Sequence, residues 1–274
     1  MRDKKSLQAY TYLYTSIATF WTYDYACSLH QEWTFLLRSR WSKVKCLYIA
    51  TRYVPFLLLA GNLYLNFMPN KNSDTCKMLN NICSCFSLIS VTCSEFFFVL
   101  RTYALWNNHR FVLATTLTAI VAVIVASVSV SFATTATESF ATSVVPGITG
   151  CYQSSASVHL FIPFLLLLLL ELVLMTLTLV RAIQNWRTTK SHMYAVLVKH
   201  NIFYYACGLF FSTVNVLATL LLHYDYHVMF QDLQFFVLAI LATRMHRHLW
   251  HIDRRVHAFV LIPMSDMYSA AGTT

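Results

Sequence analysis

The chain has 274 residues, of which 57% are hydrophobic and only 11% are charged. Soluble domains carry about 25% charged residues, and a soluble fold of this length could not cover so much apolar surface. The net charge of +9 is spread over short segments between apolar stretches, so it does not indicate nucleic acid as a partner. The Leu-rich runs lack the alternation of a β-barrel. The composition therefore predicts an all-α integral membrane protein.

Seven stretches are long enough to cross a hydrocarbon core of about 30 Å as helices. We place them near residues 9–28, 44–67, 82–104, 111–133, 158–181, 201–222 and 228–245. The first and the seventh are the weakest, because they contain Asp24 and Asp232 among other polar residues. Residues 1–262 are expected to form one seven-helix domain that ends in an in-plane tail helix, followed by a short tail over 263–274.

Basic residues are distributed unequally between the two sets of loops. Fourteen Lys and Arg residues fall on the side that holds the loops after the first, third and fifth spans and the C-terminal tail, and only five fall on the other side. Cytoplasmic loops collect Lys and Arg. We therefore expect the N-terminus outside and the C-terminus in the cytoplasm, with the plasma membrane as the default location.

Charged residues inside the spans are informative, because each costs about 2.5–3.5 kcal/mol at a helix centre. Arg52 of the second span and Glu95 of the third lie at a similar depth, roughly 12 Å from the cytoplasmic ends of their helices. This predicts a buried Arg52–Glu95 pair, with Asp24 as a competing partner for Arg52. The three residues are expected to form an ionic cluster inside the bundle, either to fix helix register or to act as a switch.

Glu171 interrupts a run of leucines in the fifth span and has no cationic partner at its depth. Such an acid must face the interior, be protonated or meet polar groups such as Ser212 and Asn215 of the sixth span. Glu171 and Asn215 are therefore our candidates for a ligand cavity.

Eight cysteines are present, and no two have the CxxC spacing. Cys76 and Cys151 fall in predicted outer loops, where an oxidising exterior would allow a disulfide. That disulfide would hold the 134–157 loop across the mouth of the bundle. Cys83 is the alternative partner.

The histidines His223 and His227, with Asp225 and Asp232, gather at the outer junction of the last two spans. Their loose spacing favours solvated loop histidines over a zinc site. No phosphate-binding loop, catalytic dyad or nucleophile elbow is present. We therefore expect no enzyme, no cofactor and no metal.

Several short motifs stand out, most of them before residue 106. They are Tyr23-Asp24-Tyr25, Glu32-Trp33, Trp41-Ser42, Lys45, Arg52-Tyr53, Pro55, the segment from Arg101 to Trp106, and Arg244. In these positions the chain resembles a family of multi-span membrane proteins of unknown function from mushroom-forming fungi. The resemblance implies a seven-helix membrane topology and no particular activity.

In outline the chain also resembles G-protein-coupled receptors, through its seven spans, the Cys76 and Cys151 arrangement and the Arg101-Thr-Tyr103 segment. Arg101 and Tyr103 are therefore our candidates for a cytoplasmic switch. The chain departs from those receptors at Leu100, where they have an acid. It also lacks Cys-Trp-x-Pro in the sixth span and Asn-Pro-x-x-Tyr in the seventh, and no span contains the lysine that a retinal needs.

These features favour a receptor-like or sensing role. A proton-linked transporter that uses Arg52, Glu95 and Glu171 is the alternative, and an outer-face zinc hydrolase is the third. The expected partners are the lipid bilayer, a small-molecule or peptide ligand, and a cytoplasmic signalling protein.

Overall fold

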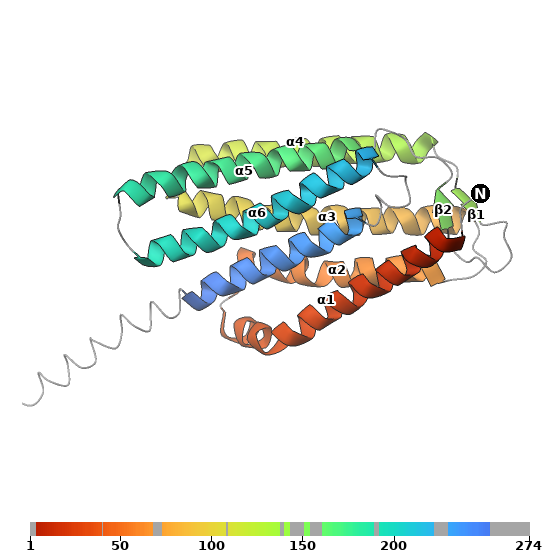
Figure 1. Ribbon diagram of the computed structural model, residues 1–274, viewed down its shortest axis with the longest axis horizontal. Coiled ribbons are helices and arrows are strands. Elements are labelled where there is room, and N and C mark those ends of the chain that lie inside the picture. Colours follow the sequence, from red (N-terminus) through yellow and green to blue (C-terminus); the bar gives the residue numbers. More distant parts are fainter. Residues whose placement is uncertain are drawn as a thin grey trace, which may run out of the picture.

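The computed structural model describes residues 4–39, 41–67, 73–107, 109–137, 140–142, 151–153, 161–188, 192–221 and 230–252. These residues form seven helices and one short hairpin (Figure 1). The helices are α1 (Lys4–Arg38), α2 (Lys43–Phe67), α3 (Ser73–Leu105), α4 (Arg110–Thr137), α5 (Phe161–Thr188), α6 (His192–Leu221) and a helix over 230–252, which we call the last helix. The strands are β1 (Phe140–Thr142) and β2 (Cys151–Gln153).

Five of the helices are long and apolar enough to cross a membrane, which confirms the middle five predicted spans. Their apolar segments are Lys43–Leu65, Asp74–Leu105, Arg110–Val130, Phe161–Gln184 and Ile202–Leu221. Within the described residues, α1 and the last helix do not reach that standard. They are the two spans that the sequence marks as weakest, and their crossing of the membrane stays a prediction, as does the placement of the termini.

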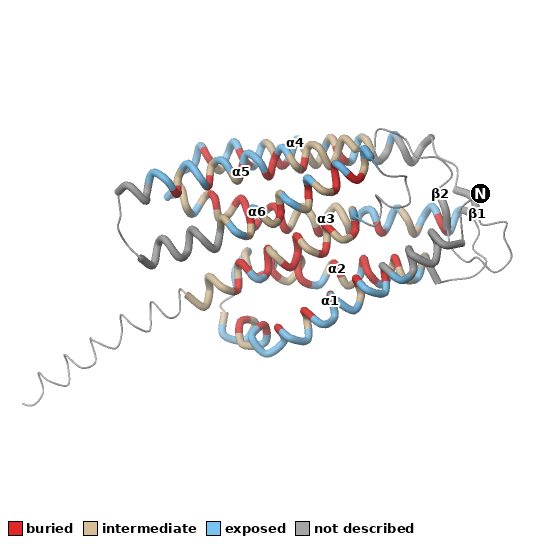
Figure 2. The backbone as a smooth tube through the Cα atoms, in the orientation of Figure 1, coloured by how far each residue is buried: buried red, intermediate tan, exposed pale blue. Residues whose placement is uncertain are grey.

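Successive helices run in alternating directions along the long axis of the bundle, so α3 and α5 point the same way (Figure 1). Buried residues line the faces between the helices, and exposed residues cover the outside (Figure 2). On α4, Phe111, Val121 and Val125 are large apolar residues that remain exposed. This pattern is expected of helices whose outer faces meet lipid rather than water.

Several predicted boundaries need correction. α1 continues to Arg38, well beyond the predicted end at residue 28, because the added turns bury Phe35 and Glu32 inside the bundle. α3 begins at Ser73 rather than at residue 82, so Cys76 lies in a helix and not in a loop. The last helix continues to residue 252, and the remainder of the predicted tail helix lies outside the described residues.

The predicted 134–157 loop contains an antiparallel hairpin, which is a small exception to the all-α prediction. β1 and β2 pair Phe140 with Gln153, Ala141 with Tyr152 and Thr142 with Cys151. The hairpin lies at the end of the bundle where α3 begins (Figure 1).

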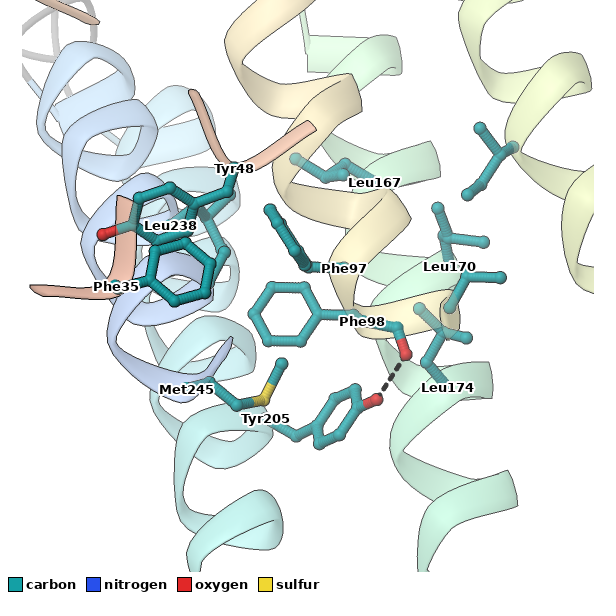
Figure 3. Close-up of a cluster of buried hydrophobic side chains, with 13 residues drawn as sticks. Phe35, Tyr48, Phe97, Phe98, Leu167, Leu170, Leu174, Tyr205, Leu238 and Met245 are labelled. Atoms are coloured by element: carbon teal, nitrogen blue, oxygen red, sulfur yellow. Dashed lines mark hydrogen bonds between the residues drawn. The ribbon is translucent and has the colours of Figure 1, made fainter. Parts of the chain in front are cut away.

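The interior is built from two apolar clusters. The larger one joins all seven described helices through residues such as Phe35, Tyr48, Phe97, Leu174 and Met245 (Figure 3), and Ile120 is its member from α4. The smaller one packs Trp21 of α1 against Leu58 of α2 and Phe236 of the last helix. These contacts place the polar groups described next inside the bundle.

Glycine allows α2 and α3 to approach closely. A Cβ atom added to Gly61 would lie 2.7 Å from Sγ of Cys83, closer than packed atoms come. Small residues at helix contacts are the usual means of close packing in membrane bundles.

Candidate functional site

Arg52 of α2 is the centre of a buried ionic cluster. Its side chain is 1% exposed, and each of its three nitrogens donates a hydrogen bond to α1. Nη1 donates to Asp24 Oδ2 at 2.8 Å, Nε donates to Glu32 Oε2 at 3.1 Å, and Nη2 donates to the Ser28 hydroxyl. The three acceptors recur every four residues, so they lie along one face of α1.

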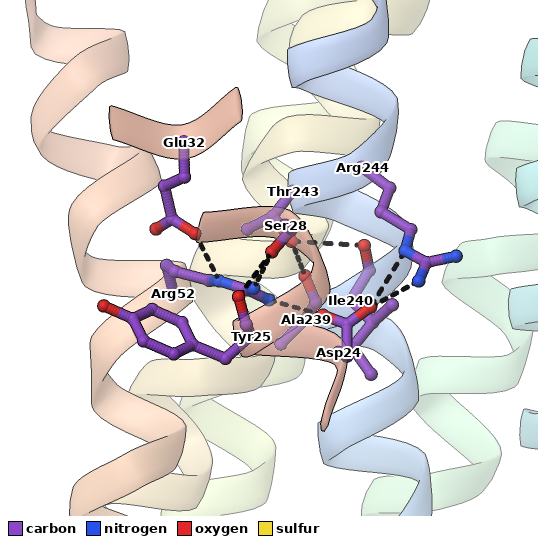
Figure 4. A network of polar contacts seen from close by, with 9 residues as sticks. All are labelled: Asp24, Tyr25, Ser28, Glu32, Arg52, Ala239, Ile240, Thr243 and Arg244. Atoms are coloured by element: carbon purple, nitrogen blue, oxygen red, sulfur yellow. Dashed lines mark hydrogen bonds and ion pairs between the residues drawn. The ribbon is translucent and has the colours of Figure 1, made fainter. Parts of the chain in front are cut away.

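The last helix joins the same cluster through Arg244. Its Nε donates to Asp24 Oδ1 at 3.0 Å, and its Nη2 donates to the same oxygen. Asp24 therefore bridges two arginines from different helices, and the cluster connects α1, α2 and the last helix (Figure 4). We call Asp24, Ser28, Glu32, Arg52 and Arg244 the Arg52 cluster.

Two aromatic rings lie beside the guanidinium group of Arg52. The Arg52 guanidinium carbon lies 5.4 Å from the ring centre of Trp21 and 5.3 Å from that of Tyr25. Both distances are within the range of cation–π attraction. Arginine suits this place, because its planar fork can serve several acceptors at once while its face lies against aromatic rings.

The predicted pair of Arg52 with Asp24 is confirmed, whereas the predicted pair of Arg52 with Glu95 is wrong. All nitrogens of Arg52 are used by α1 residues, and within the described residues neither carboxyl oxygen of Glu95 has a hydrogen-bond partner. Depth along a helix can be read from the sequence, but the direction in which a side chain points around the axis depends on the neighbouring helix.

Glu95 of α3 lies near Glu171 of α5 instead. Both side chains are buried, at 2% and 5% exposure, and the two carboxyls interact electrostatically. Ser212 of α6 is the polar neighbour of Glu171, as predicted, although the carboxyl makes no hydrogen bond of ordinary geometry. We call Glu95 and Glu171 the acid pair.

The helical register supports this proximity independently. Thr102 and Thr178 each follow one of the two acids by seven residues, which is two helical turns and nearly the same face. Their hydroxyl oxygens lie 3.4 Å apart. Since α3 and α5 run in the same direction (Figure 1), the acids meet at one level and the threonines about 10 Å further along.

A group of neutral polar side chains connects α6 to the last helix next to Glu171. Asn215 Nδ2 donates to Gln234 Oε1, and Gln234 Nε2 donates to the Ser212 hydroxyl, each at 2.5 Å. Asn215 is thus held by Gln234, one of the polar residues of the weak seventh span. The ligand cavity predicted at Glu171 and Asn215 stays a prediction.

A second set of contacts joins α3, α5 and α6 beyond the acid pair. The Tyr205 hydroxyl of α6 donates to the Phe98 carbonyl at 2.6 Å and lies 2.9 Å from the Thr102 hydroxyl (Figure 3). Further along, Trp106 Nε1 donates to the Leu177 carbonyl, and Arg181 Nε donates to the Leu105 carbonyl. We call Thr102, Trp106, Thr178, Arg181 and Tyr205 the Tyr205 network.

The predicted switch residues Arg101 and Tyr103 flank this network. Arg101 interacts electrostatically with Tyr205. In the described part of the chain, however, the side chains of Arg101 and Tyr103 form no hydrogen bond. Thr102, between them, carries the contacts. Sequence reasoning missed it because a threonine in a span is usually bonded only to its own helix.

Cys76 is disulfide-bonded, whereas Cys83 is a buried cysteine that forms no disulfide. The alternative that used Cys83 is therefore wrong. Cys151 begins β2, whose hairpin lies at the end of the bundle that also holds the start of α3. The pairing of Cys76 with Cys151 stays a prediction.

Among the described residues, no group of three or more His, Cys, Asp or Glu side chains could hold a metal ion. His223, Asp225 and His227 lie outside those residues, so the interpretation of these histidines as solvated loop residues stays a prediction.

The fold and its five apolar helices define a multi-pass helical membrane protein. Residues 12–57 match a family described as a family of unknown function, DUF6533. The match spans the α1 and α2 members of the Arg52 cluster, from Asp24 to Arg52. No curated protein matches the chain.

Proposed function

We propose that this protein is a receptor-like or sensing membrane protein, in which the acid pair is the sensing site and the Tyr205 network is the responding element. The observation that carries the proposal is that α3 and α5 contribute residues to both the acid pair and the Tyr205 network. Each helix places an acid and, two turns later, a threonine that meets its counterpart on the other helix.

The coupling follows from electrostatics in a medium of low dielectric. Two carboxylates close together repel strongly when they are buried away from water. A change in the charge of the pair therefore changes the force between α3 and α5. Apart from the contact of Arg181, the Tyr205 network is made of a few neutral hydrogen bonds, which in membrane bundles contribute about 0.6 kcal/mol each on average. Such contacts are weak enough to rearrange in response.

The predicted orientation would place the Tyr205 network on the cytoplasmic side, near the basic residues that follow α5. A signalling protein that binds there would sense a rearrangement of α5 and α6. The lipid bilayer is the other partner, as the exposed apolar side chains of α4 indicate.

The test measures the spacing of α5 and α6 beside the network. Spin labels at Ile183→Cys and Phe203→Cys, both exposed positions, report that spacing by pulsed electron resonance in nanodiscs, in a background without the free cysteines. We expect the distance distribution of Glu95→Gln to differ from that of the wild type, in the same direction as that of Tyr205→Phe. If Tyr205→Phe moves the labels and neither Glu95→Gln nor Glu171→Gln does, the acid pair is not the sensing site.

A proton-linked transporter is the second candidate, and the same buried acids favour it. Arg52 does not fit a transport path, because all its nitrogens are bound within the Arg52 cluster. Collapse of an imposed pH gradient in proteoliposomes that is lost in Glu171→Gln would favour transport over sensing. Zinc found in purified protein would favour the third candidate, a hydrolase.

A further inference from the structure

Within the described residues, the acid pair lacks the counter-charge that buried carboxylates require. In that part of the chain, both oxygens of Glu95 and both oxygens of Glu171 are buried without a hydrogen bond of ordinary geometry. An ionised carboxylate in such a place is costly unless a cation or several donors face it. The Arg52 cluster shows how this chain satisfies an acid that stays charged, because Asp24 accepts hydrogen bonds from two arginines.

The groups around the pair offer no such compensation. On α3 the nearest basic residue is Arg101, which interacts with Tyr205 rather than with the acids. Tyr205 of α6 is the other titratable group that interacts with Glu95. Ser212 of α6 is neutral, and Gln234 of the last helix is bound to it. Arg181 of α5 is bonded to the end of α3.

The space beside the pair is small. A Cβ atom added to Gly208 of α6 would lie 3.7 Å from Glu171 Oε1 and 3.4 Å from Leu238. The Glu171 carboxyl is therefore packed against the backbone of α6, with apolar Leu238 next to it. An organic ammonium ion would have to displace these contacts, whereas a proton needs no room.

We propose that the acid pair is a proton-binding site, at which one of the two carboxyls holds a proton near neutral pH. Binding transfers a proton from solvent to a carboxylate oxygen, and release returns it to solvent and leaves two carboxylates. The proton is then the ligand of the sensing site, and this role of the site rests on the proposed function. The binding of the proton does not rest on the proposed function.

Infrared difference spectroscopy of the full-length protein in nanodiscs tests the binding directly. The carbonyl stretch of a protonated carboxylic acid is separate from the bands of a carboxylate. We expect the wild type minus Glu95→Gln/Glu171→Gln difference to contain this band near neutral pH. The band should be lost as the pH is raised between about pH 5 and pH 9, the range across which solvent-exposed acids are already ionised.

Asp74→Asn is the matched control, because it removes an exposed acid from the same helix as Glu95 and should leave the band unchanged. The single variants Glu95→Gln and Glu171→Gln serve if the double variant does not fold. Absence of the band from wild type minus variant at every pH would overturn the proposal.

The two claims can fail separately. A band that titrates while the spin labels at residues 183 and 203 stay at one distance leaves the proton site standing and removes the sensing role. Labels that respond to the Gln variants without any such band leave the sensing role and remove the proton.

Discussion

The Arg52 cluster and the acid pair are both buried groups of charged residues, yet they differ in how far their hydrogen bonds are satisfied. In the cluster, every nitrogen of Arg52 and both oxygens of Asp24 are used, and one oxygen of Glu32 remains without a partner. In the acid pair no oxygen has a partner of ordinary geometry among the residues that the structure describes. Satisfied buried charges hold helices in place, whereas unsatisfied ones inside a membrane indicate a functional site.

This contrast also accounts for the two weakest helices. α1 and the last helix carry Asp24, Glu32 and Arg244, and these are the helices that fall short of the apolar standard. Asp24 and Glu32 pair with Arg52, and Arg244 pairs with Asp24, which offsets much of the cost of burying these charges in the bundle. Substitutions in the two groups test the contrast, and their expected effects on stability decrease from Arg52 to Glu95.

The largest effect is expected for Arg52→Met, which leaves Asp24 and Glu32 buried without their shared cation. Removing one partner of a buried ion pair costs about 3–5 kcal/mol. Thermal or denaturant unfolding in detergent micelles measures the loss. Lys77→Met removes an exposed basic residue and is the control. Equal stability of the two variants would contradict a structural role for the cluster.

A smaller loss of about 1 kcal/mol is expected for Arg244→Gln. The side chain of Arg244 is 51% exposed, and exposed members of ion pairs contribute little. The same assay in an Asp24→Asn background provides the control, because the loss should vanish there. A loss that persists without Asp24 would show that Arg244 stabilises the fold by another route.

A loss of about 1 kcal/mol is expected for Tyr205→Phe, since two hydrogen bonds are removed and those between membrane helices average about 0.6 kcal/mol each. The variant loses the bonds to the Phe98 carbonyl and to Thr102. Tyr204→Phe, at the neighbouring position, should match the wild type. A change of several kcal/mol would mean that the Tyr205 network is a main support of the fold and too stable to respond.

The smallest effect is expected for Glu95→Gln, because no hydrogen bond is lost and a buried acid is replaced by a neutral amide of similar shape. Stability should change by less than about 0.5 kcal/mol or increase. Glu32→Gln is the comparison, because that buried acid is bonded to Arg52 and its substitution should destabilise. A loss at Glu95 as large as that at Arg52 would place the acid pair with the structural groups.

Much of the fold could be predicted from the sequence, because lipid imposes long apolar helices and the loops carry the charge bias. Depth along the helices offers both Glu95 and Asp24 as partners of Arg52, and it cannot choose between them. Glu32 cannot be recognised as a partner while α1 is predicted to end before it, so the repeat of Asp24, Ser28 and Glu32 every four residues has no evident meaning in the sequence.

The arrangement around the acid pair was harder to predict. The seven-residue spacing from Glu95 to Thr102 and from Glu171 to Thr178 is present in the sequence. It gains meaning only once α3 and α5 are known to be neighbours that run in the same direction. The role of Gln234 was equally hidden, because its partners Asn215 and Ser212 belong to another helix. Contacts between helices depend on rotation about each axis, which hydropathy does not report.

A double-mutant cycle between Asp24 and Arg52 tests whether the Arg52 cluster fastens α1 to α2. The cycle compares unfolding in micelles of Asp24→Asn, Arg52→Gln and the combined variant. If the cluster has this role, the combined variant will lose far less stability than the sum of the single losses, because the second change removes a charge that the first has already left unpaired. Strictly additive losses would contradict it, since they would mean that the two side chains do not support each other.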